Sequence, residues 1–492
     1  MTRTPSVLRN AGWLTGAFLL GRGASLVWQL VLARFLTDRV EVYGQLGVLL
    51  ALSAICILLA EFGLNVSAQQ EWPKGRFTAA ELLGILGTLR LLFGGLSVAL
   101  LIGTVYALYG RGEMLSASLP MAVSLFVSGQ LQSPVGVFEA RQEMRTVAIL
   151  SGLQTAVLIP AQFLALRYWG TLFALCAAIA VSSIVTAGYG WLRAVRAWGR
   201  PRLPRAGRAG EALRLLASLG LPVALSSITF VLYYRIDAVL LSKWVSDAAA
   251  GVFVLATLLF MGLVDASWSQ MGKALFPQLA DAWVRKGDPQ GTPRHLGVMV
   301  RLYLVFSIVV LALGLTVGER VLRLVFGATS PWLQTWQPLM ILTLGFWPIV
   351  LYGLCSRLLL LEGRRYWYAG LVVASTILKF TLAVYLIKSL GATGAAVSNT
   401  LSQLAMTGLT LGGLGTLATH VVPWRLRLQY VVSVIAVAAG WWLTRAWAWY
   451  LALGAEVILV GVLVSLSGLT DVVREAGRRS VALLSRRPSP AT

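Results

Sequence analysis

Eight basic side chains interrupt the long apolar stretches of this sequence, whereas only three acidic side chains do so, apart from Glu61 at the end of a stretch. A charged group inside a lipid bilayer is costly unless it is paired or faces water, so each of these residues is a candidate for function. An excess of cations favours an anionic ligand, and guanidinium groups bind phosphates through paired N–H donors. The bases are Arg22, Arg34, Arg90, Arg235, Lys273, Arg301, Arg357 and Lys379, and the acids are Asp237, Asp265 and Glu456.

The depth of each residue within its apolar stretch indicates which of them bind a ligand. Arg22 and Lys379 lie near the middle of theirs, and we expect both to face a central cavity. Ser25 and Gln29 follow Arg22 at three- and four-residue spacings, so the three share one polar face of a helix. Arg34 and Lys273 lie at the ends of stretches, where long basic side chains extend to the membrane surface. The predicted substrate-binding residues are Arg22, Ser25, Gln29, Arg90, Arg235, Arg357 and Lys379.

Two acidic residues are candidates for coupling transport to an ion gradient. Asp265 lies near the middle of its apolar stretch. Asp237 lies two residues from Arg235 and nearer the end of its stretch. Asp237 has a second interpretation, because a buried carboxylate also forms structural bridges to neighbouring helices. The sequence leaves both interpretations of Asp237 open.

Residues for covalent or metal chemistry are absent from the apolar stretches. The two histidines, His295 and His420, lie between stretches, and no nucleotide-binding loop or metal-spaced cluster occurs in the sequence. Cys56, Cys176 and Cys355 lie singly inside stretches, where cysteine is usually a small apolar filler. We therefore predict no catalytic residue, no metal site and no cofactor, and we expect that the protein is not an enzyme.

The apolar stretches predict an all-α polytopic membrane protein. Hydrophobic residues make up 58% of the 492 residues and charged residues only 12%, against about 25% charged in soluble domains. A helix needs about 20 apolar residues to cross the hydrocarbon core. Fourteen stretches qualify: 12–35, 44–64, 82–109, 115–138, 147–166, 170–192, 215–241, 251–276, 296–317, 335–361, 368–387, 391–417, 428–443 and 449–469.

The distribution of charge predicts the orientation in the membrane. The net charge is +22, and 25 of the 41 basic residues lie in the segments that are cytoplasmic if the N-terminus is inside. Only eight lie in the opposite loops. This asymmetry follows the positive-inside rule and predicts that both termini are cytoplasmic. Topogenic charge accounts for the basicity, so we expect no nucleic-acid partner.

An internal repeat predicts two lobes. Leu36-Thr-Asp38 and Tyr43-Gly44 have counterparts in Val245-Ser-Asp247 and Ala250-Gly251, about 210 residues later. Parallel repeats of this kind occur in transporters, with the substrate path between the two halves. We predict a six-helix lobe over 1–198, a cytoplasmic linker over 199–214, a second six-helix lobe over 215–420, and two further helices with a cytoplasmic tail over 421–492.

Local motifs resemble one family of membrane transporters. Leu32-Ala-Arg-Phe-Leu-Thr-Asp38, Glu61-Phe-Gly-Leu-Asn65, Arg235-Ile-Asp237 and Leu390-Gly-Ala-Thr-Gly-Ala-Ala396 are similar, in this order and spacing, to Wzx-type polysaccharide flippases. These flippases belong to the multidrug/oligosaccharidyl-lipid/polysaccharide (MOP) exporter superfamily. The resemblance covers residues 10–415, and the count of fourteen helices is similar to the lipid II flippase branch.

The resemblance implies a function in the synthesis of cell-surface polysaccharide. It implies the flipping of an undecaprenyl-pyrophosphate-linked oligosaccharide across the bacterial cytoplasmic (inner) membrane by alternating access. Implied partners are this lipid-linked substrate, membrane lipid, and polysaccharide polymerase or assembly proteins. The alternatives are a lipid II flippase and a multidrug or cation antiporter, which needs an acid embedded in the membrane; Glu61 and Glu81 lie only at the ends of stretches. A membrane glycosyltransferase or polymerase is a further alternative, but every predicted outer loop is short.

Overall fold

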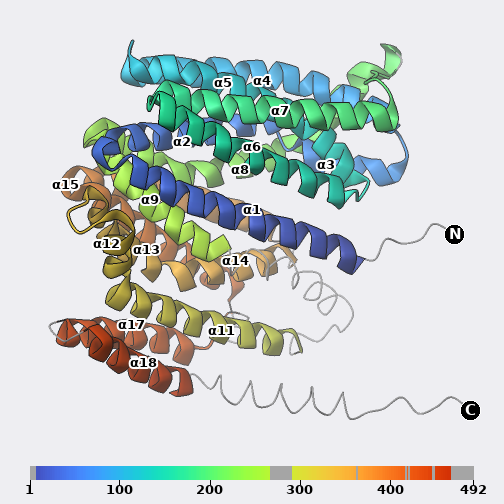
Figure 1. Ribbon diagram of the computed structural model, residues 1–492. Helices are drawn as coiled ribbons and strands as arrows, with labels where there is room; N and C mark the ends of the chain where they lie inside the picture. Colours follow the sequence, from blue (N-terminus) through green and yellow to red (C-terminus); the bar gives the residue numbers. More distant parts are fainter. Residues whose placement is uncertain are drawn as a thin grey trace, which may run out of the picture. The chain divides into compact units, whose positions relative to one another are not determined.

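The computed structural model describes residues 7–204, 206–265, 291–361, 364–415, 418, 422–445 and 449–466, and every regular element in them is a helix (Figure 1). Ten helical stretches in these ranges are long and apolar enough to cross a membrane, judged by length and composition. Each of the fourteen predicted stretches is helical over most of its described residues. The predicted all-α membrane fold is therefore confirmed.

The first part of the chain folds into long helices that turn back on one another. Short 3₁₀ turns at Thr37–Arg39 and Trp72–Lys74 precede α2 and follow α3. The helices are α1 (Val7–Phe35), α2 (Val40–Glu61), α3 (Leu64–Glu71), α4 (Ala79–Tyr109), α5 (Glu113–Ala140), α6 (Met144–Tyr168), α7 (Leu172–Trp198), α8 (Ala206–Trp244) and α9 (Asp247–Val264).

The second part of the chain contains shorter helices and one long, kinked helix. A π-helical segment at Gly314–Gly318 and a 3₁₀ turn at Pro331–Thr335 flank α12. The helices are α11 (Gly291–Leu313), α12 (Glu319–Phe326), α13 (Trp336–Leu344), α14 (Phe346–Leu361), α15 (Arg365–Leu414), α17 (Trp424–Thr444) and α18 (Trp449–Leu466).

Helix α15 contains two of the predicted spans, and a glycine separates them. Gly391 has φ 59° and ψ −133°, a backbone conformation that residues with a Cβ rarely adopt. Three residues later, a Cβ on Gly394 would lie 1.9 Å from the Leu386 carbonyl oxygen. The motif Leu390–Ala396 therefore forms the kink between the two spans, where Gly391 supplies the backbone conformation and Gly394 allows the close approach.

The chain packs into two compact units, which do not coincide with the predicted lobes. The first contains α1 to α8, α9 as far as Gly262, and the middle of α15 (Thr376–Ala395). The second contains α11 to α14, the remainder of α15, α17 and α18. The predicted linker is also shorter than expected: α7 ends at Trp198, and α8 already begins at Ala206. The repeat-based lobes stay a prediction.

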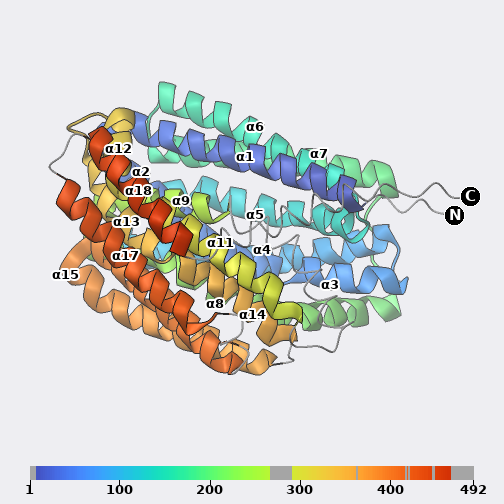
Figure 2. The same cartoon turned by 90° about the horizontal axis from the view of Figure 1, so that it is seen from below.

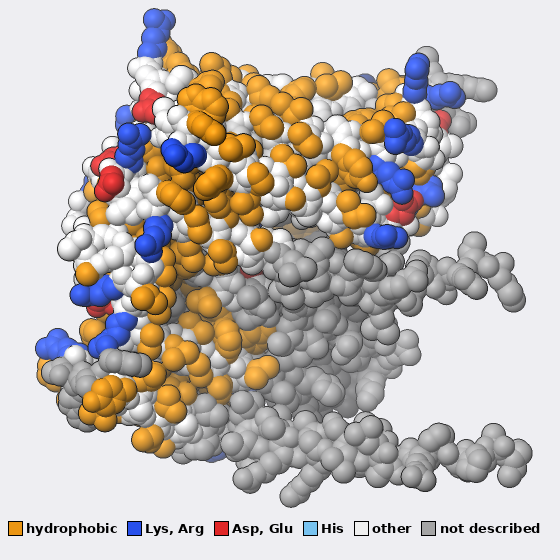
Figure 3. Space-filling model, viewed as in Figure 1, with side chains coloured by type: hydrophobic (Ala, Val, Ile, Leu, Met, Phe, Trp, Pro, Cys, Tyr) orange, Lys and Arg blue, Asp and Glu red, His pale blue; other side chains and the backbone are white. Residues whose placement is uncertain are grey.

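The first unit has two ends and an apolar middle. We call the end at which α1 finishes, together with the α4–α5, α6–α7 and α8–α9 turns, the distal end. In Figure 3 the visible face of α4, α5 and α7 shows hydrophobic side chains along its middle, and Lys and Arg gather towards both ends. This distribution is typical of a helical bundle that crosses a bilayer.

Helix ends in the first unit are satisfied by local side chains. Thr78 and Glu81 form a reciprocal capping box at the start of α4, with the Thr78 N–H donating to Glu81 Oε2 at 2.9 Å. Thr171 Oγ1 accepts from the Ala174 N–H at 3.3 Å at the start of α7. These caps set the points at which the chain re-enters the apolar layer.

Glycines bring α2 and α9 into close contact at the distal end. A Cβ on Gly44 would lie 1.8 Å from the Asp247 carbonyl oxygen and 2.9 Å from the Gly251 nitrogen. One turn along α2, a Cβ on Gly47 would lie 2.7 Å from a Val254 methyl group. Contact this close is possible only without a side chain, as at small-residue helix crossings in membranes.

A polar network ties four helices together beside this crossing. Asp247 Oδ2 accepts from Gln45 Nε2 of α2 at 2.8 Å, and Asp247 Oδ1 accepts from the Ser242 hydroxyl of α8. Tyr109 of α4 donates in turn to Ser242 Oγ at 3.0 Å. The distal end of the first unit is therefore held closed by backbone packing and by hydrogen bonds.

Candidate functional site

Arg22 and Arg235 form a pair of like charges inside the first unit. Arg22 lies on α1 and Arg235 on α8, more than two helical turns from the nearest helix end. Both side chains are exposed at the surface of the protein, and the two guanidinium groups repel one another. An anion that contacted both groups would replace this repulsion by attraction. The arrangement therefore fits an anionic ligand.

Neighbouring contacts fix the face of α1 that carries Arg22. Trp28 is buried and donates from Nε1 to Gln162 Oε1 of α6 at 2.6 Å, and Figures 1 and 2 show α1 running beside α6. Gln29 is half-buried and accepts from the Tyr43 hydroxyl of α2 at 3.5 Å. Ser25 is also half-buried. Helical spacing puts Ser25 and Gln29 on the face of Arg22, and their role in binding substrate stays a prediction.

Arg90 was predicted to bind substrate, but the structure buries it among protein groups. Its side chain is 0% exposed, donating from Nη2 to Asn65 Oδ1 at 2.6 Å and from Nη1 to Ser133 Oγ at 3.1 Å. The carboxylates of Glu61 and Glu139 attract the guanidinium group. Arg90 therefore lies within a polar cluster formed by α2 to α5, where its charge has protein partners.

Glu61 and Asn65, the partners of Arg90, were not predicted from the sequence, because Glu61 was placed at the end of a span. The helical stretch instead continues over Thr37–Lys74. Phe62 and Gly63, both with positive φ, interrupt it only briefly. The motif Glu61-Phe-Gly-Leu-Asn65 could have indicated the cluster, because it places one polar side chain before the interruption and one after it.

Lys379 also differs from the prediction that it faces a cavity. Its Nζ lies 2.8 Å from Asp237 Oδ2, and the two side chains are 1% and 0% exposed. The same ammonium group donates to the Tyr233 carbonyl oxygen and lies 4.4 Å from the centre of the Tyr233 ring. Of the two interpretations of Asp237, the structure favours the bridge to a neighbouring helix. This buried ion pair joins α8 to α15 within the first unit.

The remaining predicted residues lie in the second unit or outside the described ranges. Arg357 on α14 is half-buried, and so is Asp265, the last residue described before the gap at 266–290. Lys273 lies in that gap. Among the residues that the structure describes, no group of three or more metal-ligating side chains is positioned to hold an ion.

A family of polysaccharide biosynthesis proteins matches this chain over residues 7–283, more than half of its length. The match includes α1 to α9 and therefore both arginines of the like-charge pair. A comparison with curated proteins finds no match to the chain.

Solved structures with the same fold are transporters. The chain is similar to the lipid II flippase MurJ in an inward closed conformation, with a TM-score of 0.73, 13% identity, and coverage of 94% of this chain and 99% of MurJ. An inward-facing multidrug resistance transporter of the MATE family, in the MOP superfamily, has a TM-score of 0.65 and 14% identity, with coverage of 83% of this chain and 95% of the transporter. A MOP superfamily transporter from Pyrococcus furiosus has a TM-score of 0.52 and 12% identity, with coverage of 84% of this chain and 96% of the transporter. The fold is thus that of the MOP superfamily, as the motifs indicated.

Proposed function

We propose, from the premise that this chain belongs to the polysaccharide biosynthesis protein family, that it moves an undecaprenyl-pyrophosphate-linked oligosaccharide across the bacterial cytoplasmic membrane. The observation that carries the proposal is the exposed pair of Arg22 and Arg235 on two helices of the first unit. A pyrophosphate bears negative charge on several oxygens, which two guanidinium groups can contact through paired donors.

Transport would proceed by alternating access. The close contact of Gly44 with Asp247 and Gly251 closes the distal end, so export requires that α2 and α9 separate there. Gly44 and Gly251 also occupy corresponding positions in the predicted repeat, and their contact supports a pseudo-two-fold relation between the two halves of the sequence. The substrate head would enter from the other end while the distal end stays closed.

Coupling to an ion gradient is part of the same proposal. Asp265 remains a candidate because of its depth. The role of Asp237 is more specific: protonation of its carboxylate would break the ion pair with Lys379 and weaken the link between α8 and α15. The proposed function needs no covalent chemistry and no cofactor.

We predict that the C-terminus is cytoplasmic and that the distal end faces the outside. The uneven distribution of 25 against eight basic residues is the physical reason. A reporter active only in the cytoplasm, fused after Thr492, should give full signal, and the same reporter inserted at Arg111 in the α4–α5 turn should give none. The reverse pattern would refute the orientation.

A cell that lacks its own oligosaccharide flippase provides the test of function. Expression of this chain should restore surface glycan and lower the pool of lipid-linked precursor inside the cell. The proposal would be contradicted if the wild-type protein were present in the membrane at normal abundance but restored no surface glycan with any of a panel of lipid-linked substrates.

A multidrug or cation antiporter is a second candidate function, because one observation now favours it. Glu61 lies at the end of α2, inside the longer apolar span Thr37–Lys74 and within reach of the charge of Arg90. An antiporter needs an embedded acid of this kind. This alternative would be supported if the wild-type protein exported a cationic dye, if Glu61→Gln abolished that export, and if the protein had no effect on surface glycan.

A further inference from the structure

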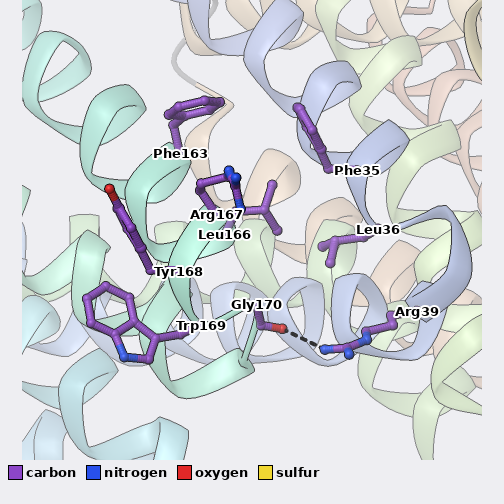
Figure 4. A pocket seen from close by; sticks show the side chains of 9 residues that line it. All are labelled: Phe35, Leu36, Arg39, Phe163, Leu166, Arg167, Tyr168, Trp169 and Gly170. Atoms are coloured by element: carbon purple, nitrogen blue, oxygen red, sulfur yellow. Dashed lines mark hydrogen bonds between the residues drawn. The ribbon is translucent and has the colours of Figure 1, made fainter.

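A groove lies at the distal end of the first unit, between the end of α1 and the end of α6. Its volume is 560 Å³, which is within the usual range for a site that holds a small ligand. Figure 4 shows it from close by, with Phe35 and Phe163 on facing helices and the α6–α7 turn below. The groove is separate from Arg22 and Arg235, neither of which lines it.

One wall of the groove is aromatic. The rings of Phe35 and Phe163 meet edge to face with centres 6.4 Å apart, and Trp28 packs on Phe163 in the same way at 6.5 Å. Phe35 is 60% exposed and Phe163 44% exposed, so both rings present apolar surface to whatever fills the groove. In a bilayer this surface fits an acyl chain.

Two arginines also line the groove, on different sides of it (Figure 4). Arg39, in the turn after α1, and Arg167, in the last turn of α6, are both exposed. Arg39 is held in place by its Nη1, which donates to the Gly170 carbonyl oxygen at 3.3 Å (Figure 4). Among the described residues that line the groove, none is acidic; Asp38 adjoins Arg39 in the chain but is not part of the lining. The net charge of the lining is therefore positive.

The groove also lies at the level where a lipid headgroup would be. Tyr168 and Trp169, which line it at the end of α6, are 72% and 67% exposed. Exposed Tyr and Trp at a helix end are typical of the boundary between hydrocarbon and water. The aromatic wall thus lies on the hydrocarbon side, and both arginines lie at the end of the span.

We propose that this groove binds an anionic phospholipid of the leaflet at the distal end. The positive charges of Arg39 and Arg167, on either side of the groove, attract its phosphate, and its acyl chains lie along Phe35 and Phe163. An anionic headgroup is favoured over a zwitterionic one, because the positive group of the latter would meet two cations and no carboxylate. The site is independent of the substrate that the protein carries, and its occupant would brace α1 against α6.

Native mass spectrometry of the purified full-length protein in detergent tests the proposal. Phosphatidylglycerol and phosphatidylcholine with identical acyl chains are titrated in parallel. The double variant Arg39→Gln/Arg167→Gln should bind phosphatidylglycerol about tenfold more weakly, which corresponds to the loss of charge-assisted contacts to one phosphate. The same variant should bind phosphatidylcholine almost unchanged.

Two further variants separate the headgroup from the chains and from general charge. Arg111→Gln/Arg445→Gln removes two other arginines from predicted outer loops and should leave the preference for phosphatidylglycerol intact. Phe35→Ala should weaken both lipids alike, since it removes chain contact only. Equal affinity of wild-type protein for both lipids, or equal loss of preference in the Arg111/Arg445 control, would overturn the proposal. Displacement of phosphatidylglycerol by undecaprenyl phosphate at equal concentration would also overturn it, because the groove would then be a substrate site.

Discussion

Replacing Asp237 by Asn is expected to remove most of the protein from the membrane. The change leaves the Lys379 ammonium group buried at 1% exposure without its carboxylate partner. Breaking a buried ion pair in this way costs about 3–5 kcal/mol. That is a large share of the total stability of many domains, which is about 5–15 kcal/mol. The measurements are membrane abundance by immunoblot and the melting temperature of purified protein.

A double variant separates the charge imbalance from other effects of the substitution. Asp237→Leu/Lys379→Met replaces both partners by apolar side chains and should return abundance close to wild type, since the pair is then absent rather than broken. Wild-type abundance of Asp237→Asn alone would show that the pair does not hold α8 to α15. Restored abundance with lost transport in the double variant would favour the coupling role proposed for Asp237.

Replacing Arg22 by Ala is expected to abolish most transport while the protein stays folded. Arg22 is exposed, so the substitution opens no cavity in the packed core of the first unit. A charge-assisted contact to the pyrophosphate is worth about 1.5–3 kcal/mol, which corresponds to a transport rate about 10- to 150-fold lower. Arg22→Lys should retain part of the activity, because it keeps the charge but loses the paired donors.

Variants of two other arginines give this prediction its controls. Arg235→Ala should resemble Arg22→Ala, and the two together should lose less than the product of the single effects, because they contact one ligand. Arg34→Gln, in the last turn of the same helix, should transport normally. Loss of Arg22→Ala from the membrane would make Arg22 a structural residue, and normal transport at normal abundance would remove it from the site.

The spans could be predicted from sequence because their length and apolar character are local properties. The break in α15 was also predictable, since Gly391 has a backbone conformation that few other residues adopt. The start of α8 at Ala206 was not, because residues 206–214 at its beginning have no apolar signal, although their Ala, Arg, Glu and Leu residues favour helix.

The surroundings of each buried charge could not be predicted, because they depend on how each helix is rotated against its neighbours. Judged by depth within a span, Arg90, Lys379 and Arg22 were all candidates for the substrate site. Tertiary packing separates them, since it gives Arg90 a polar cluster and Lys379 a carboxylate, whereas Arg22 lies near another cation.

Transport by the purified protein in liposomes tests the central claim most directly. Undecaprenyl-pyrophosphate-linked oligosaccharide is incorporated in both leaflets, and a glycosidase outside the vesicles measures how much of it becomes accessible with time. Wild-type protein should expose the inner pool, and Arg22→Ala should do so about tenfold more slowly or worse. The account is contradicted if vesicles with wild-type protein expose no more oligosaccharide than protein-free vesicles while the same preparation exports a cationic dye.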